Sequence, residues 1–177
     1  METTVIAVVG SKSSGKTTTI EILTKELTRR GYKIAAIKHI PESNFTIDMK
    51  GKDTWRFAKS GAKTIISVAS NEIATIEKVD DESLQLKELL KKCKSSDIVF
   101  IEGFRKFVAK KSNIQKIVVV KSEDEALEAL NSFKPILAFT GPYSTENLNL
   151  KVPYVDVLKN PEEIADIVEK TVRKDYT

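Results

Sequence analysis

The sequence is poor in the residues that form disulfides, metal clusters and charge-relay triads. Its 177 residues contain one cysteine, Cys93, and one histidine, His39. A single cysteine cannot form an intrachain disulfide, and a histidine-based metal cluster or a Ser/His/Asp triad lacks its usual partners. No charged-then-apolar signal precedes the first apolar run. We therefore expect a cytoplasmic location and assign Cys93 no role beyond packing.

Long apolar runs and a basic stripe are also missing. The apolar runs Val5–Val9, Ile98–Ile101 and Ile117–Val120 are four or five residues long, whereas a membrane span needs roughly 20. The net charge is only +4, and the lysines are scattered among glutamates. We therefore expect buried strands in place of membrane segments, and neither a membrane nor a nucleic acid as partner.

What the sequence does contain is a regular alternation of strand and helix patterns. The apolar content is 41%, which is enough to bury a core, and we expect a single domain over residues 1–177. Strands and helices are predicted by period and by Gly and Pro boundaries. The predicted strands are Thr4–Val9, Lys33–Lys38, Thr64–Ala69, Glu72–Lys78, Asp97–Ile101, Lys116–Val120 and Pro135–Phe139, and the predicted helices are Lys16–Arg30, Asp53–Ser60, Ser83–Lys94, Glu123–Leu130 and one beginning at Asn160.

This order of elements predicts an α/β fold. Short apolar strands joined by helices are typical of a three-layer, mainly parallel twisted sheet with helices on both faces, as in P-loop NTPases. The close spacing of the two strands between residues 64 and 78 predicts a β-hairpin inserted into that pattern. Ligands of such sheets bind beyond the carboxyl ends of the strands.

A phosphate-binding loop is predicted between the first strand and the first helix. The segment Gly10–Thr17 has the pattern G-x-x-x-x-G-K-[ST]. Its glycines allow consecutive backbone amides to turn toward a phosphate, and the helix N-terminus adds positive potential. The lysine is expected at the β- and γ-phosphates, and the following hydroxyl on Mg²⁺. The expected nucleotide contacts are Gly10, Ser11, Lys12, Ser13, Ser14, Gly15, Lys16, Thr17 and, at the α-phosphate, Thr18.

A Mg²⁺-nucleotide site usually also has a carboxylate at the end of a neighbouring strand. The strand that begins at Asp97 is followed by Glu102. The two lie about 16 Å apart in an extended strand, so only Glu102 reaches the ligand edge. We predict Glu102 as a metal and catalytic residue. The alternative is an ordinary strand end followed by a glycine turn.

The polar segment after His39 emerges at the same edge. It contains Asp48, which we predict as a second metal and catalytic residue that touches Mg²⁺ or orients the attacking water. The alternative is that Asp48 is only a turn residue. In the same segment a functional role for Asp53 and Trp55 and a structural one, as a helix cap and a core anchor respectively, are equally good interpretations.

Several of these segments together resemble one known family. In order and spacing they resemble the molybdopterin-guanine dinucleotide biosynthesis adapter family, MobB, over roughly the first 105 residues. The sequence departs from many bacterial members after Lys38-His39, where it has Ile40–Asn44 in place of a histidine-rich run. The matching segments are Gly10–Thr17, Ile37–His39, Phe45–Asp48, Gly51–Arg56, Ser60–Ala62 and Glu102–Phe104.

The resemblance implies a GTP-binding protein with weak GTPase activity. It implies that the protein binds the enzyme that attaches a guanine nucleotide to molybdopterin, or other molybdenum cofactor proteins. It also implies that the protein forms a homodimer. The expectation of GTP over ATP rests on the resemblance alone, because the sequence has no Asn-Lys-x-Asp run that would recognise the guanine base. The cofactors implied are GTP and Mg²⁺.

Two other functions remain open from the sequence. A P-loop small-molecule kinase would use Asp48 or Glu102 to orient an acceptor, although its arginine-rich lid is hard to find among five arginines. A non-hydrolysing scaffold would use the nucleotide only to order residues 39–56 for a partner.

Overall fold

A computed structural model describes residues 3–42, 44–79, 85–142 and 151–174. The chain divides into two compact units. Unit 1 comprises Met1–His39 and Leu90–Thr177, and unit 2 comprises Ile40–Leu89. Unit 2 is thus an insertion in the chain of unit 1. The expectation of a single domain over residues 1–177 stays a prediction.

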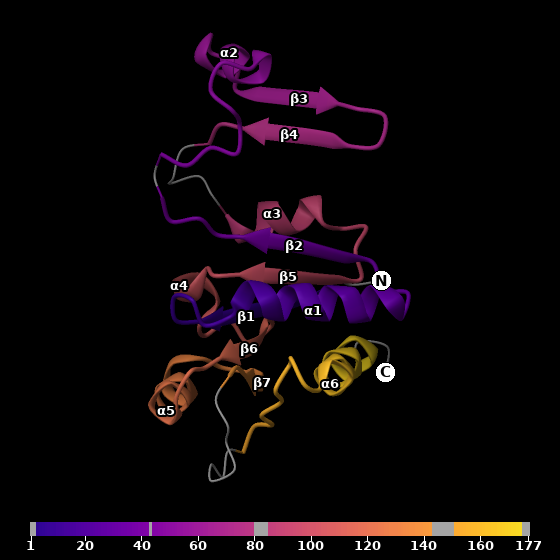
Figure 1. The fold of residues 1–177 in the computed structure, drawn as a ribbon, viewed down its shortest axis with the longest axis vertical. Helices are drawn as coiled ribbons and strands as arrows, with labels where there is room; N and C mark the ends of the chain where they lie inside the picture. Colours follow the sequence, from indigo (N-terminus) through magenta and orange to yellow (C-terminus); the bar gives the residue numbers. More distant parts are fainter. Residues whose placement is uncertain (1–2, 43, 80–84, 143–150, 175–177) are drawn as a thin grey trace. The chain divides into compact units, whose positions relative to one another are not determined.

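Unit 1 is built on a five-stranded sheet in the order β2-β5-β1-β6-β7, in which all neighbouring strands are parallel (Figure 1). The first strand of the chain lies at the centre, and β5 lies between it and β2. This arrangement confirms the predicted mainly parallel sheet. The strands are β1 (Thr4–Gly10), β2 (Ile34–Lys38), β5 (Ile98–Glu102), β6 (Gln115–Val119) and β7 (Ile136–Thr140).

The central strands are apolar because both of their faces are buried. Residues 6–9 of β1 and 98–101 of β5 are at most 1% exposed. A parallel strand covered on both faces has no polar side to alternate with the apolar one, so its sequence is a continuous apolar run. For this reason the short apolar runs predicted the strands.

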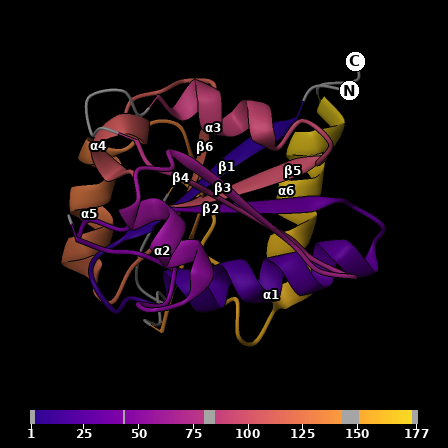
Figure 2. The same ribbon diagram turned by 90° about the horizontal axis from the view of Figure 1, so that it is seen from above.

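Helices cover both faces of this sheet (Figure 2). On one face α1 (Lys16–Arg29) and α6 (Pro161–Lys174) lie side by side, and Leu23, Leu27, Ile164 and Val168 pack on the sheet. On the other face Val108 and Phe133 are buried at α4 (Arg105–Val108) and at the end of α5 (Glu123–Ser132). Ser122 caps α5 by accepting a hydrogen bond from the amide of Glu125. The predicted three layers are therefore confirmed.

Unit 2 contains the predicted hairpin and a helix that contacts it. Strands β3 (Thr64–Val68) and β4 (Ile73–Glu77) pair antiparallel, and α2 (Asp53–Lys59) contacts β3. Within β3 the side chains alternate, because Ile65 is 6% exposed whereas Ile66 is 60% exposed.

The structure differs from the sequence prediction at two helices. Helix α3 (Leu86–Lys92), where the chain returns from unit 2 to unit 1, is shorter than the predicted Ser83–Lys94, and residues 80–84 lie outside the described residues. Helix α4 was not predicted, because four residues are too few to show a helical period. No helix among the described residues combines the length and the apolarity that a bilayer crossing requires.

Candidate functional site

The loop between β1 and α1 is held in one conformation by its small residues. A side chain at Gly10 would place its Cβ against the carbonyl oxygen of Val119 and 2.8 Å from Ser14 Oγ. Ser13 and Gly15 have φ angles of 58° and 100°, in the left-handed region that glycine adopts most easily. The glycines of the predicted phosphate loop are therefore required by close approach at Gly10 and by backbone angle at Gly15.

Lys16 closes the loop on itself. Its Nζ donates a hydrogen bond to the carbonyl oxygen of Ser11 at 2.6 Å. Burial lowers the pKa of Lys16, and the nearby Glu102 carboxylate acts in the opposite direction. An ammonium that spans the loop from within is positioned to meet an anion bound by the same loop.

Two buried hydroxyl oxygens of the loop, Ser11 Oγ and Ser14 Oγ, have no hydrogen-bond partner in the described part of the chain. Buried hydroxyls are normally satisfied, because an unpaired polar group away from water costs free energy. A phosphate oxygen seated in the loop is an acceptor that such hydroxyls fit. The loop residues therefore agree with an anion ligand.

A carboxylate lies beside the first turn of α1. The hydroxyl of Thr17 donates to Glu102 Oε2 at 2.9 Å, and Lys38 Nζ lies 3.1 Å from Glu102 Oε1. Glu102 is the last residue of β5 and is paired in register with Val8 and Lys38. The structure thus places Thr17 and Glu102 together, as the sequence predicted.

Asp97 lies at the opposite end of β5. Its Oδ2 accepts a hydrogen bond from the backbone amide of Lys33 at 2.7 Å, and its carbonyl accepts one from Thr4. These contacts hold the turn that precedes β2. The strand geometry that favoured Glu102 over Asp97 agrees with this placement.

Asp48 lies in unit 2, where its contacts are local. Its Oδ1 accepts hydrogen bonds from the hydroxyl of Thr54 at 2.8 Å and from the amide of Met49 at 2.9 Å. These bonds order the start of α2. A role for Asp48 at the metal or the attacking water stays a prediction.

The remaining predicted loop residues lie at the surface. Lys12, Ser13 and Thr18 are exposed. The carbonyl oxygen of Lys12 accepts a hydrogen bond from Lys121 Nζ at 3.4 Å. Lys121 follows β6, next to β1, so a second lysine reaches the same loop from the neighbouring strand.

Two lysines near the loop, Lys38 and Lys121, are not predicted as site residues by the sequence. Lys38 ends β2 at the same sheet edge as Glu102, but in the sequence it belongs only to a segment that resembles the family. The strand order reveals its role, because β2 is the neighbour of β5, and the sequence alone does not contain that order.

The described residues hold no group of three or more His, Cys, Asp and Glu side chains arranged to bind a metal. Mg²⁺ does not need such a group, because it keeps several waters and is bound through one or two carboxylates together with phosphate oxygens. Thr17 Oγ1 and Glu102 are an oxygen pair of this kind. The residues present therefore fit Mg²⁺ bound with a nucleotide.

The fold and the loop first define a class: an α/β protein whose helix-covered parallel sheet carries a Walker A sequence after its central strand. The model of the family "Molybdopterin guanine dinucleotide synthesis protein B", MobB, matches residues 5–141. The chain belongs to this family.

Relatives from three organisms are similar to this chain in sequence. The molybdopterin-guanine dinucleotide biosynthesis adapter protein of Escherichia coli is 30% identical over 91% of this chain and 89% of its own length. The protein of the same name from Haemophilus influenzae is 29% identical over 93% of this chain and 86% of its own length. A Methanocaldococcus jannaschii relative is 40% identical over 68% of this chain, and the match spans only 48% of that relative.

Solved structures agree in fold. The crystal structure of Bacillus subtilis MobB aligns with a TM-score of 0.75 at 22% identity and covers 94% of this chain and 96% of its own. A crystal structure of molybdopterin-guanine biosynthesis protein B (mobB) aligns with a TM-score of 0.71 at 24% identity and covers 96% of this chain and 99% of its own.

Proposed function

We propose that this protein is a Mg²⁺-GTP-binding adapter in the biosynthesis of molybdopterin guanine dinucleotide, with weak GTPase activity. The observation that carries the proposal is the contact between Thr17, at the start of α1, and Glu102, at the end of β5, directly beside the loop Gly10–Lys16. The biosynthetic role rests on family membership and on the names of the relatives.

Different residues of the site would contact different parts of the nucleotide. The amides of residues 10–15 and the ammonium of Lys16 would bind the β- and γ-phosphates, and Thr18 would lie at the α-phosphate. Thr17 and Glu102 would hold Mg²⁺, which neutralises phosphate charge when bound. Asp48 would orient the water that attacks the γ-phosphate.

Slow hydrolysis of GTP is consistent with an adapter, whose function depends on the nucleotide that is bound and not on rapid turnover. The bound nucleotide would then determine whether partner proteins bind. We take these partners to be the molybdopterin guanylyltransferase or other molybdenum cofactor proteins, and we place the interaction in the cytoplasm. We further propose that the adapter acts as a homodimer.

Calorimetry with GTP, GDP and ATP in the presence of Mg²⁺ tests the proposal. We expect GTP binding that Lys16→Ala abolishes, because the ammonium of Lys16 lies against the loop backbone, where it would meet the phosphates. Lys25→Ala, which removes a lysine further along the same helix, serves as the matched control and should bind as the wild type does.

Tight ATP binding without a response to GTP would contradict the guanine assignment. Capture of purified partner proteins with GTP, GDP and no nucleotide then tests the adapter role. Capture that is indifferent to the nucleotide would contradict a nucleotide-dependent adapter.

A further inference from the structure

Lys38 reaches the predicted metal ligands because of strand register. Lys38 and Glu102 are paired residues on neighbouring parallel strands, so their side chains leave the sheet on the same face. Ile34 and Phe100, which share that alternation, pack into the core under α1. Lys38 and Glu102 lie further along the same face of their strands, at the strand ends. Their side chains therefore point toward the first turn of α1, where Thr17 lies.

The three side chains form a closed triangle. Lys38 Nζ lies 3.1 Å from Glu102 Oε1 and 3.5 Å from Thr17 Oγ1, and Thr17 Oγ1 lies 2.9 Å from Glu102 Oε2. The Thr17 hydroxyl donates its hydrogen bond to the carboxylate, so its lone pairs face away from Glu102. The ammonium of Lys38 therefore faces the hydroxyl oxygen and the carboxylate oxygen that a metal would use.

We propose that the ammonium of Lys38 and a divalent cation compete for Thr17 Oγ1 and Glu102, and that Lys38 thereby sets the metal dependence of nucleotide binding. The proposal rests on the proposed function, since Mg²⁺ is expected to arrive with the nucleotide. Lys38 is a positioning residue in this account, because it acts through the metal ligands.

Simultaneous binding of both cations to these oxygens is unfavourable. Mg²⁺ binds oxygen at about 2.0–2.1 Å, so an ammonium at its present distances would face a divalent charge at close range. The Glu102 side chain is only 13% exposed, so the carboxylate that both cations would share is itself largely shielded from water.

Departure of the lysine costs little. The Lys38 side chain is 54% exposed, and its flexible four-carbon stem lets the ammonium move into water. An exposed ion pair is worth little by itself, so its function is better understood as occupation of the metal ligands than as stabilisation of the fold.

The test compares the wild-type chain with Lys38→Met, Lys38→Gln and Lys38→Arg. Mn²⁺ binding to the nucleotide-free protein is followed by electron paramagnetic resonance. The Mg²⁺ concentration that gives half-maximal binding of a fluorescent GTP analogue is measured separately. Lys33→Met removes the same charge just before the opposite end of β2 and is the matched control.

We expect Lys38→Met and Lys38→Gln to bind Mn²⁺ about two- to fivefold more tightly and to lower the Mg²⁺ midpoint by a similar factor, which is the range expected when the competing exposed ion pair is removed. Lys38→Arg and Lys33→Met should keep the wild-type midpoint. Unchanged or weaker metal binding in Lys38→Met would overturn the proposal.

The two readouts separate this proposal from the proposed function. A wild-type chain that fails to bind GTP, together with tighter Mn²⁺ binding by Lys38→Met, would overturn the nucleotide function and support the competition. GTP binding by the wild type with identical Mg²⁺ midpoints in all variants would support the function and overturn the competition.

Discussion

Lys116 is a charged side chain in a place where charges are rare. It lies near the start of β6, is 0% exposed, and donates hydrogen bonds of 2.6 Å from Nζ to the carbonyl oxygens of Lys111 and Lys134. Desolvation lowers the pKa of Lys116 to about 8. The side chain thus joins the segment before β6 to the segment before β7.

The burial of Lys116 predicts a pH dependence of stability. Between pH 8 and 10.5 the unfolded chain holds a proton at this lysine that the folded chain has lost, so its contribution to the free energy of unfolding rises with pH in that window. We expect the difference between wild type and Lys116→Met, measured by urea unfolding from pH 7 to 10, to increase above pH 8 in favour of the wild type. Lys110→Met, at an exposed lysine, is the control, and parallel pH profiles for wild type and Lys116→Met would contradict the account.

Among individual residues, the sequence predicts only those site residues that belong to a motif or that end an apolar strand. The loop residues are recognised by spacing, and Glu102 by its place at the end of an apolar run. Lys38 has no motif of its own, because its importance comes from its pairing with Glu102, and the sequence does not give strand order.

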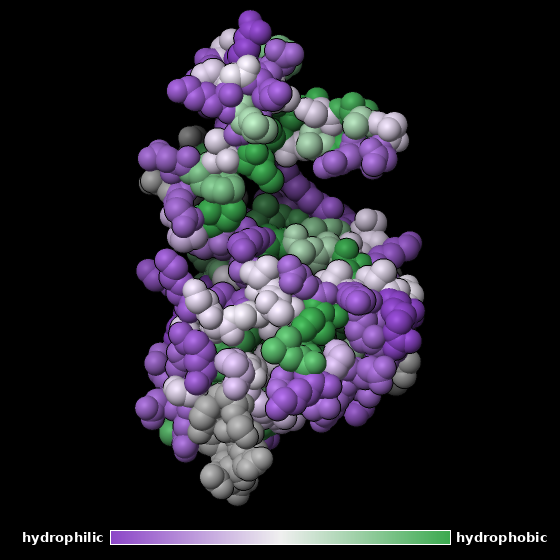
Figure 3. Space-filling view, viewed as in Figure 1, coloured by the Kyte–Doolittle hydropathy of each residue, from purple (hydrophilic) through white to green (hydrophobic). Residues whose placement is uncertain are grey.

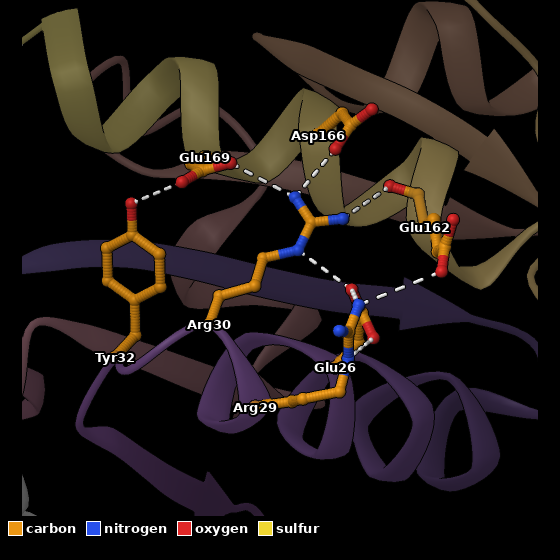
Figure 4. A network of polar contacts seen from close by, with 7 residues as sticks. All are labelled: Glu26, Arg29, Arg30, Tyr32, Glu162, Asp166 and Glu169. Atoms are coloured by element: carbon orange, nitrogen blue, oxygen red, sulfur yellow. Dashed lines mark hydrogen bonds and ion pairs between the residues drawn. The ribbon is translucent and has the colours of Figure 1, made fainter.

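Among the elements, α1 and α6 are joined by a polar network at the end of α1 (Figure 4). The guanidinium of Arg30, just after α1, bonds to Glu26 Oε1 at 2.8 Å, Asp166 Oδ1 at 2.6 Å and Glu169 Oε2 at 3.0 Å. The Tyr32 hydroxyl donates to the same Glu169 at 2.8 Å. The Arg30 side chain is 18% exposed, so these charges are partly shielded from water.

Arg30→Met should therefore lower the free energy of unfolding by about 1–3 kcal/mol, because partly buried carboxylates lose their charged donor. Its neighbour Arg29 also contacts Glu26 but is 65% exposed, and Arg29→Met should lower the free energy of unfolding clearly less than Arg30→Met does. Urea unfolding at pH 7 compares the two variants, and equal losses would contradict a special role for Arg30.

Acid should remove part of this stabilisation. Hydrogen bonds from Arg29 and Arg30 lower the pKa of Glu26 from 4.5 to about 2. The stability that ionised Glu26 contributes is therefore present above pH 4.5 and is lost as the pH falls toward 2. The difference between wild type and Arg30→Met should shrink over the same window.

Most elements could be predicted because their sequence signals are local. The buried strands are apolar runs, α5 begins at its Ser122 cap, and α6 begins with Pro161. The α1–α6 network could not be predicted, since it joins residues more than 130 positions apart.

At the scale of the whole molecule, the hairpin of unit 2 carries an exposed apolar face. Ile66, Val68 and Ile73 are 60%, 73% and 69% exposed, and Val68 and Ile73 are directly paired. Figure 3 shows apolar side chains at the surface of β3 and β4. An isolated two-stranded hairpin is marginally stable in water, and such a face is typical of a protein contact.

If the protein is the proposed homodimer, this apolar face is the surface we expect to join the copies. Light scattering after size exclusion should give twice the chain mass of 19.8 kDa, and Val68→Lys should shift the protein to the monomer by burying an unpaired charge. Asn71→Lys, which adds the same charge in the turn of the hairpin, should remain dimeric. A monomeric wild type would contradict the dimer, and a dimeric Val68→Lys variant would contradict this choice of surface.

The insertion of unit 2 between two neighbouring strands has a consequence for how such chains can diverge. The entropy of closing a loop grows only with the logarithm of its length, so joining β2 to β5 across about 60 residues costs only about 1.6 kcal/mol more than across about ten. The parallel sheet therefore tolerates changes in the length of this insertion at small cost. Substitutions and insertions in unit 2 can therefore accumulate without disturbing the strand register that pairs Lys38 with Glu102.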